Sequence, residues 1–288
     1  MKNTIFFFAI CCLFLSSCQT ATESKETEAP ISENPMDNLP RIWQLRDYDL
    51  INAEGNLDAS QKESLEGKVK REGLQFCFIP NQTGNSITGE IYEEFIWDFN
   101  VADATIIMKK KSSENKWTDV RIEKGGKSWK LTATENNIAK IELIGSASLT
   151  ANIAEEPFHP LNNQWRVKAT KYEEVPALKE RLLNFVTHYK YLFKASIDNP
   201  KRSFTNSKSG GIILIYKGAI AFVGEKKIPT EWSYAFYDEY QAKDTYKLFK
   251  KYMNNKTITK EALSDWKPVN LQILRELETK IKADIAGN

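Results

Sequence analysis

The chain has 288 residues, with 40 Lys or Arg and 38 Asp or Glu, so its formal net charge at pH 7 is +2. Nucleic-acid binding needs a concentrated basic field, and this balanced composition gives no reason to expect a nucleic-acid partner. Histidine is scarce, and His159 and His188 lie far from each other and from Cys77. A zinc or copper site built on these residues is therefore not expected, and we predict no cofactor.

Residues 1–17 have the layout of a secretory signal. Lys2 provides a positive start, an almost unbroken apolar run extends from Ile5 to Leu15, and small residues follow. A basic region, an apolar core and a small-residue cleavage site are typical of a signal peptide. The run is shorter than the roughly 20 apolar residues that a membrane-spanning helix needs. We therefore expect residues 1–17 to be removed.

The signal ends in Leu15-Ser16-Ser17-Cys18, which resembles the lipobox of bacterial lipoproteins. The resemblance implies cleavage before Cys18, a diacylglyceryl thioether on its sulfur and usually an acyl group on its new amine, which together anchor the protein in a membrane. Gln19 stands where an aspartate would signal retention in the inner membrane of some Gram-negative bacteria. The resemblance therefore favours the outer membrane, with the protein facing the periplasm or the cell surface. The alternative is an ordinary signal peptide with a coincidental cysteine.

Residues 18–39 are predicted to form a disordered acidic tether. The acidic residues that outnumber Lys25 here are Glu23, Glu26, Glu28, Glu33 and Asp37. A segment with so little to bury stays solvated, and we expect it to lift the folded part off the membrane.

Residues 40–150 are predicted to form a β-rich domain. Phe95, Trp97 and Phe99 alternate with Ile96 and Asp98, and this period of two is typical of an antiparallel strand with one buried face.

The clearest β pattern covers residues 119–144. Three alternating runs are separated by Gly-Gly at 125–126 and Asn-Asn at 136–137, residue types that can adopt the positive φ that tight hairpins need. The pattern predicts a three-stranded meander. Before it, a short helix is predicted over residues 60–71, interrupted by Gly67.

Six aromatic residues of this domain would converge if its sheet closes on itself, where they would fill a small barrel or line a cavity in it. They are Phe76, Phe78, Phe95, Trp97, Phe99 and Trp129.

Residues 40–146 loosely resemble the lipocalin-like domains of Bacteroidetes lipoproteins. The likeness lies in the segments 42–45, 74–78 and 95–97 and in the closing meander. Two details differ, because Arg41-Ile42 replaces the usual glycine before the opening tryptophan, and residues 81–84 replace a glycine-threonine turn. The resemblance implies an antiparallel barrel with a ligand-binding role.

Residues 151–163 contain few apolar side chains and are predicted to be a linker, followed by an α+β domain over 164–288. Amphipathic spacing and the turn residue Pro176 predict a long helix. The expected elements are a helix over 176–197, a hairpin over 212–223, a further strand over 231–237, and helices over 238–253 and 259–285, the last kinked or split by Pro268.

No arrangement of residues points to catalysis. There is no Gly-x-Ser-x-Gly pattern, and adjacent carboxylates such as Glu93-Glu94 point to opposite faces of a strand. For both His159 and His188 a partly exposed structural role is expected. The alternating Trp232, Tyr234 and Phe236 suggest either a core face or a surface that stacks on sugars or lines an apolar pocket. Trp232 and Tyr234 are therefore candidate ligand-binding residues.

The sequence thus predicts an α+β protein with a β-barrel-like, lipocalin-like first domain and an α+β second domain. We expect a non-enzymatic envelope lipoprotein that binds a small apolar or amphipathic ligand or an envelope partner. One alternative is an interaction lipoprotein that has no small ligand and docks through the helix of residues 176–197. An envelope hydrolase using His188 is a third reading.

Overall fold

The computed structural model of the chain describes residues 35–51, 57–89, 91–126, 128–200, 228, 230–253 and 266–287. The predicted signal peptide, Cys18, most of the tether and the predicted hairpin over 212–223 lie outside the described residues. Across the described ranges, no helix combines the length and the apolar content that crossing a membrane requires.

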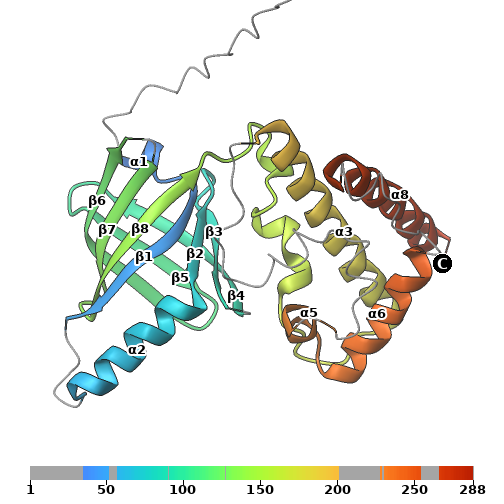
Figure 1. The fold of residues 1–288 in the computed structure, drawn as a ribbon, viewed down its shortest axis with the longest axis horizontal. Coiled ribbons are helices and arrows are strands. Elements are labelled where there is room, and N and C mark those ends of the chain that lie inside the picture. Colours follow the sequence, from blue (N-terminus) through green and yellow to red (C-terminus); the bar gives the residue numbers. More distant parts are fainter. Residues whose placement is uncertain are drawn as a thin grey trace, which may run out of the picture. The chain divides into compact units, whose positions relative to one another are not determined.

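The first domain is a closed barrel in which each strand pairs antiparallel with the next and β1 pairs with β8 (Figure 1). Its strands are β1 Ile42–Leu50, β2 Leu74–Phe78, β3 Thr83–Thr88, β4 Ile91–Asn100, β5 Thr105–Lys110, β6 Glu114–Gly125, β7 Ser128–Glu135 and β8 Ala139–Ala147. This architecture confirms the predicted antiparallel, barrel-like domain, shows that its sheet closes, which the sequence left open, and is consistent with the lipocalin-like domain that the resemblance implies.

Strands β6 to β8 form the predicted meander, and its turns use the expected residues. Gly126 has a φ of 61°, and Asn136 and Asn137 have φ values of 49° and 57°. Glycine and asparagine reach this left-handed region at little cost, which allows β7 to fold back tightly on both neighbours.

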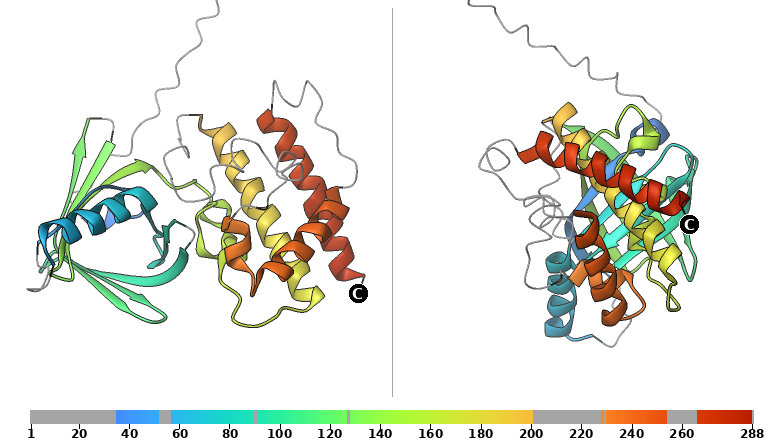
Figure 2. Two further views of the ribbon diagram at one scale, coloured as in Figure 1. Left: turned by 60° about the horizontal axis from the view of Figure 1, so that its bottom comes forward. Right: turned by 90° about the vertical axis from the view of Figure 1, so that its right-hand side faces the viewer.

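Two short helical elements flank the barrel strands. α1 Pro35–Asn38 precedes β1, and the next residue, Leu39, is fully buried in the barrel core. Residues 35–39, which fall inside the predicted tether, therefore belong to the folded part. α2 Ala59–Glu72 connects β1 to β2 at one end of the barrel (Figures 1 and 2) and confirms the helix predicted over 60–71.

Helix α2 starts at a capping box. Asp58 accepts from the backbone N–H of Gln61, whose side chain accepts in return from the Asp58 backbone. Gly67 lies inside the helix and does not interrupt it, because one helical glycine costs only about 1 kcal/mol.

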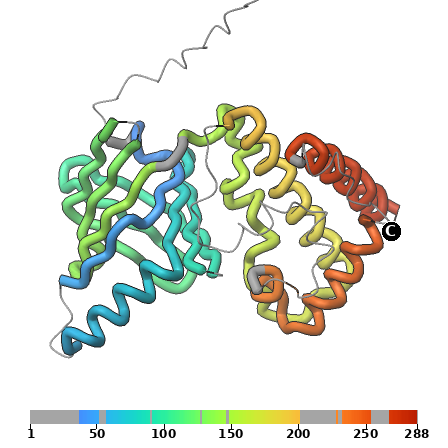
Figure 3. The backbone as a smooth tube through the Cα atoms, in the orientation of Figure 1, coloured from blue at the N-terminus to red at the C-terminus, as the bar shows by residue number. Residues whose placement is uncertain are grey.

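Beyond the barrel the chain passes through three 3₁₀ turns, η1 Ile153–Glu155, η2 Pro160–Asn162 and η3 Gln164–Arg166, and then enters the helices (Figure 3). The described helices of this part are α3 Val175–Asp198, α5 Thr230–Ala235, α6 Glu239–Met253 and α8 Trp266–Ala286. α3 and α8 lie side by side (Figure 2), and Lys190 Nζ lies 2.8 Å from Glu278 Oε2 across their contact.

The strand predicted over residues 231–237 is wrong, because most of this segment is helix α5. Trp232 and Phe236 are both buried, and their ring centroids lie 5.1 Å apart. Phe236 directly follows the last residue of α5. The i, i+4 spacing of this pair fits one face of a helical turn, and it fits alternate positions of a strand as well. Pro268 is the third residue of α8, and a first-turn proline is compatible with a helix.

The two cores of the protein share the wall of the barrel. Large side chains on the inner face of the strands fill the first core. The outer face of β1 to β4 contributes Ile42, Cys77, Ile87 and Tyr92 to the second core, which continues into α3, α5, α6 and α8. Cys77 is fully buried there, as expected for a small apolar side chain.

Candidate functional site

Five of the six predicted barrel aromatics lie together inside the barrel. Phe76, Phe78, Phe95, Trp97 and Phe99 belong to the inner core and are at most 7% exposed. The ring centroid of Phe78 lies 5.3 Å from that of Phe95 and 5.6 Å from that of Trp97. A barrel of eight strands has an interior that side chains can fill. These rings therefore form a packed core.

Trp129 sits at the margin of this core and is partly buried. The guanidinium carbon of Arg41 lies 4.2 Å from the Trp129 ring and 5.7 Å from the Trp43 ring. Burial lowers the pKa of Arg41 to about 10, so it remains charged at pH 7 and makes cation–π contacts with both rings. These contacts, with the bond from Arg41 Nε to the carbonyl oxygen of Asn38, tie the residue before β1 to the side chains of β1 and β7.

Trp232 and Tyr234 are not brought together with the barrel aromatics. Trp232 is 2% exposed, lies in the second core and donates from Nε1 to the carbonyl oxygen of Ala242 at 3.0 Å. Tyr234 is half-buried, and Lys168 Nζ lies 5.4 Å from its ring centroid. The structure thus gives Trp232 the core role that the sequence left open.

An apolar groove lies on the outside of the barrel, opposite the packed rings. Its volume is about 590 Å³. Its floor is the outer face of β3 to β5, where Thr83 pairs with Ile96 and Ile96 with Lys109. One wall is the segment 159–164. Ile96 is 64% exposed and Leu161 is 70% exposed, so the groove presents two large apolar side chains to solvent.

The wall of the groove is fixed by buried polar contacts. Asn85 on β3 donates from Nδ2 to the carbonyl oxygen of Phe158 at 2.5 Å. Asn163 donates to the carbonyl oxygens of Pro157 and His159 at 2.6 and 3.0 Å. Because these bonds hold the backbone on both sides of Leu161, that side chain is presented by an ordered wall.

Lysines gather at the β5 end of the groove. Lys109, Lys110 and Lys111 all line it, and Lys109 and Lys111 are exposed. Lys110 Nζ lies 2.6 Å from Glu93 Oε2, so this lysine is engaged within the barrel. The two exposed ammonium groups beside apolar side chains make this end of the groove attractive to an anion.

The titratable side chains of Glu94 and His159, which line the groove, already make hydrogen bonds within the protein. Glu94 Oε1 accepts from Gln164 Nε2 at 2.5 Å and from the Tyr92 hydroxyl at 3.2 Å. His159 Nδ1 accepts from the backbone N–H of Leu161, and burial lowers the pKa of His159, which makes it neutral at pH 7. Glu94 is thus the negative charge on the groove floor, and it already accepts two hydrogen bonds.

His188 belongs to the second core. Its Nδ1 donates to the carbonyl oxygen of Pro157 at 2.9 Å, and its ring packs 5.8 Å from that of Trp165. Burial, with a smaller effect from Arg166, lowers the pKa of His188 to about 3. Buried and bonded in this way, His188 has the environment of a structural histidine. The expected partial exposure is wrong, because His188 is 2% and His159 8% exposed. The described residues also contain no cluster of three or more His, Cys, Asp or Glu arranged to hold a metal ion.

Sequence reasoning did not find this groove. Ile96 occupies an outward position of β4, between the outward residues Glu94 and Asp98. An apolar residue among polar ones on an exposed face is one sequence feature that indicates a binding surface. The other signal was the run of three lysines at 109–111. Neither signal predicts that residues 159–164 pack beside them.

Comparisons of the chain with protein-family models, with curated proteins and with solved structures found no match.

Proposed function

We propose that the protein is a lipid-anchored envelope lipoprotein, without enzymatic activity, that binds a small amphipathic ligand in the outer groove of its barrel. The observation that carries this proposal is an exposed apolar groove of about 590 Å³ with lysines at one end. This size lies within the range of about 300–1,000 Å³ that is usual for small-ligand pockets.

The apolar part of the ligand would cover Ile96 and Leu161. Both line the groove and are well above half exposed, and exposed apolar side chains gathered at one site are typical of a binding surface. Burying one such side chain stabilises a complex by about 1.5–3 kcal/mol. Contact with both side chains therefore supports binding of an acyl-like chain.

The charged part of the ligand is expected to be an anion. Lys109 and Lys111 offer ammonium groups at the end of the groove, whereas Glu94 already accepts bonds from Gln164 and Tyr92. A carboxylate or similar group placed at the lysines would gain charge-assisted hydrogen bonds. An anionic amphiphile is thus favoured over a cationic one with the same chain.

The anchor is proposed from the sequence alone, through the likeness of Leu15-Ser16-Ser17-Cys18 to a lipobox. Intact mass of the membrane-extracted protein tests it. The expected mass is that of residues 18–288 plus acyl chains, and an unlipidated mass would contradict the anchor. Protease accessibility on whole cells then tests whether the protein faces the surface or the periplasm.

Binding is tested by titrating the protein with decanoate and, separately, with decylamine in calorimetry. Decanoate is expected to bind, and decylamine more weakly. Ile96→Asn is expected to weaken decanoate binding about tenfold, since about 1.5 kcal/mol of apolar burial is lost. Reversing the charges of Lys109 and Lys111 to Glu is expected to remove the preference for the anion.

Two matched controls make this test specific. Val101→Asn changes another exposed apolar side chain of the barrel, and Lys116→Glu reverses an exposed lysine on β6. Both are expected to bind decanoate as the unaltered protein does. Equal weakening by Val101→Asn and Ile96→Asn would contradict the groove as the site.

The alternative, an interaction lipoprotein that docks through α3, would be supported by an exposed apolar stripe on that helix. The apolar residues of this stripe are buried in the second core: Leu178, Leu182, Phe185, Val186, Tyr189, Leu192 and Phe193. No observation on α3 therefore favours this alternative over the groove.

A further inference from the structure

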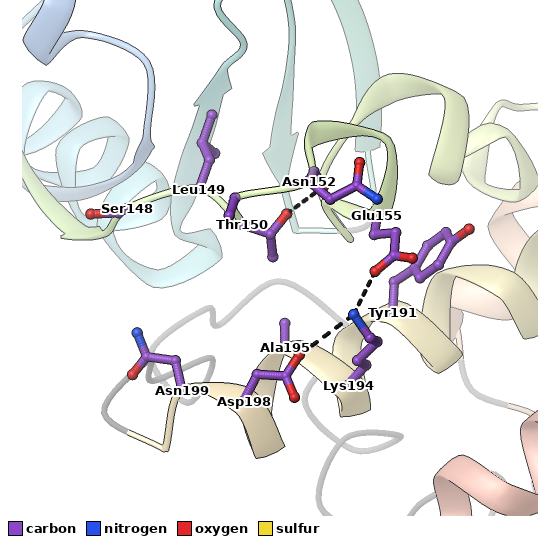
Figure 4. A pocket seen from close by; sticks show the side chains of 11 residues that line it. Ser148, Leu149, Thr150, Asn152, Glu155, Tyr191, Lys194, Ala195, Asp198 and Asn199 are labelled. Carbon is purple, nitrogen blue, oxygen red and sulfur yellow. Dashed lines mark hydrogen bonds and ion pairs between the residues drawn. The ribbon is translucent and has the colours of Figure 1, made fainter. Parts of the chain in front are cut away.

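A second pocket, of about 320 Å³, lies between the segment that follows β8 and the last turns of α3 (Figure 4). The side chains that line it from the segment include Thr150, Asn152 and Glu155, and those from α3 include Tyr191, Lys194 and Asp198. None of the residues that line this pocket lines the apolar groove. The two sites therefore differ in position and in chemistry.

An ion triad crosses this second pocket. Lys194 Nζ lies 2.6 Å from Glu155 Oε2 and 3.6 Å from Asp198 Oδ2. Figure 4 shows the Lys194 side chain between the two carboxylates, which come from opposite sides of the pocket. The three side chains are 41%, 32% and 61% exposed, so a ligand from solvent can reach them.

The triad offers both strong acceptors and a strong donor around one point. Carboxylates only accept and an ammonium only donates, and hydrogen bonds to either are stronger than those between neutral groups. Two carboxylates and one ammonium sum to a charge of −1, which disfavours an anion. A hydroxyl group both donates and accepts, so neighbouring hydroxyls on one ligand match this arrangement.

The remaining lining also suits a ligand with hydroxyl groups on an apolar ring. Asn152 contributes an amide, and the hydroxyl of Thr150, which donates to the backbone carbonyl of Asn152, keeps acceptor capacity. Tyr191 contributes a half-buried aromatic ring. Lys190 Nζ lies 4.5 Å from its centroid, so the C–H face of a sugar would pack against the opposite side of the ring. The volume lies near the lower end of the range for ligand pockets, which suits a ligand of one sugar ring.

We infer that this second pocket binds a neutral saccharide, with the Glu155–Lys194–Asp198 triad bonding its hydroxyls and Tyr191 packing against its ring. This binding is independent of the anchor and of the apolar groove. Loss of decanoate binding would leave it unaffected, and so would an unlipidated Cys18.

Saturation-transfer NMR on the full chain tests the inference, with glucose and N-acetylglucosamine as probes and cadaverine as a cationic control. Saturation transfer to the ring protons of at least one sugar is expected, with none to cadaverine. Lys194→Met keeps the apolar stem of the side chain but removes the donor, and Tyr191→Leu removes the ring. Each variant is expected to weaken sugar binding at least tenfold.

The matched control is Lys243→Met, which removes another helix lysine that pairs with a carboxylate, 3.6 Å from Glu239 on α6. It is expected to bind the sugar as the unaltered protein does. The inference is overturned if neither sugar receives saturation, if cadaverine binds in place of the sugars, or if Lys194→Met and Tyr191→Leu both bind as the control does. Circular dichroism of each variant shows whether a loss of binding reflects unfolding.

Discussion

The inner and outer faces of strand β4 are built from neighbouring residues but differ in burial and in role. Phe95 and Trp97 point inward and are 3% and 2% exposed, packed against Phe78. Ile96, between them, points outward and is 64% exposed, whereas Tyr92 on the same outer face is covered by the second core. The interior of the barrel is used for stability. The outer face is partly covered by the helical part and partly left as a groove.

The largest expected effect is the difference in stability lost when a side chain is removed from the inner or from the outer face of β4. Trp97→Ala deletes a buried ring and is expected to destabilise the protein by about 3–5 kcal/mol, from lost burial and the cavity left behind. Ile96→Ala, one position away, is expected to cost less than about 0.5 kcal/mol because Ile96 is mostly exposed. Urea unfolding measures both. Equal costs would contradict the assignment of the faces.

The second expected effect concerns pH and the core that covers the outer face. Burial lowers the pKa of His188 from 6.5 to about 3. The unfolded chain therefore binds a proton that the folded protein excludes, and stability is lost as pH falls from about 6.5 towards 3. Between pH 7 and pH 5 the loss is expected to be about 2 kcal/mol.

The control for this pH effect is His188→Gln, which keeps an N–H donor near the carbonyl oxygen of Pro157 and cannot gain a charge in this range. Its stability is expected to fall less than that of the unaltered protein over the same pH interval. Parallel stability–pH curves for the two proteins would show that His188 is not the acid-sensitive group.

The smallest expected effect concerns α2, which contacts the outside of the barrel without burying any of its residues. Lys70 Nζ lies 2.7 Å from Asp47 Oδ1 on β1. Lys70→Ala is expected to cost at most about 1 kcal/mol, and less at high salt, because an exposed ion pair is screened. Lys68→Ala, which alters a pair within α2, is the control. Hydrogen exchange of α2 amides distinguishes loss of docking from loss of helix.

Where apolar and polar residues alternate, the sequence predicted the strands, because alternation reports directly on which face is buried. The runs around Phe95 and over residues 119–144 became β4 and the meander of β6 to β8. The same logic failed at Trp232 and Phe236, since a short apolar run fits a helix and a strand equally. The sequence also did not show whether the barrel aromatics fill the interior or line a cavity in it, because that depends on how tightly the closed sheet packs them.

The groove was beyond prediction for a different reason. Its floor and wall are joined by contacts such as that between Glu94 and Gln164, which lie 70 residues apart in the chain. Alternation marks Ile96 as outward-facing, but only the folded chain shows that residues 159–164 pack beside it. The second pocket likewise forms only when Glu155 and Lys194 come into contact, and these residues lie 39 positions apart in the chain.

The most direct test of the central claim asks which face of β4 the amphipathic ligand contacts. Isoleucine methyl groups are labelled with ¹³C, and their NMR signals are followed as decanoate is added. Binding in the groove is expected to shift the methyl signal of Ile96 on the groove floor and to leave unshifted that of Ile106, which is fully buried inside the barrel. A shift of the Ile106 signal with the Ile96 signal unchanged would place the ligand inside the barrel and contradict binding in the outer groove.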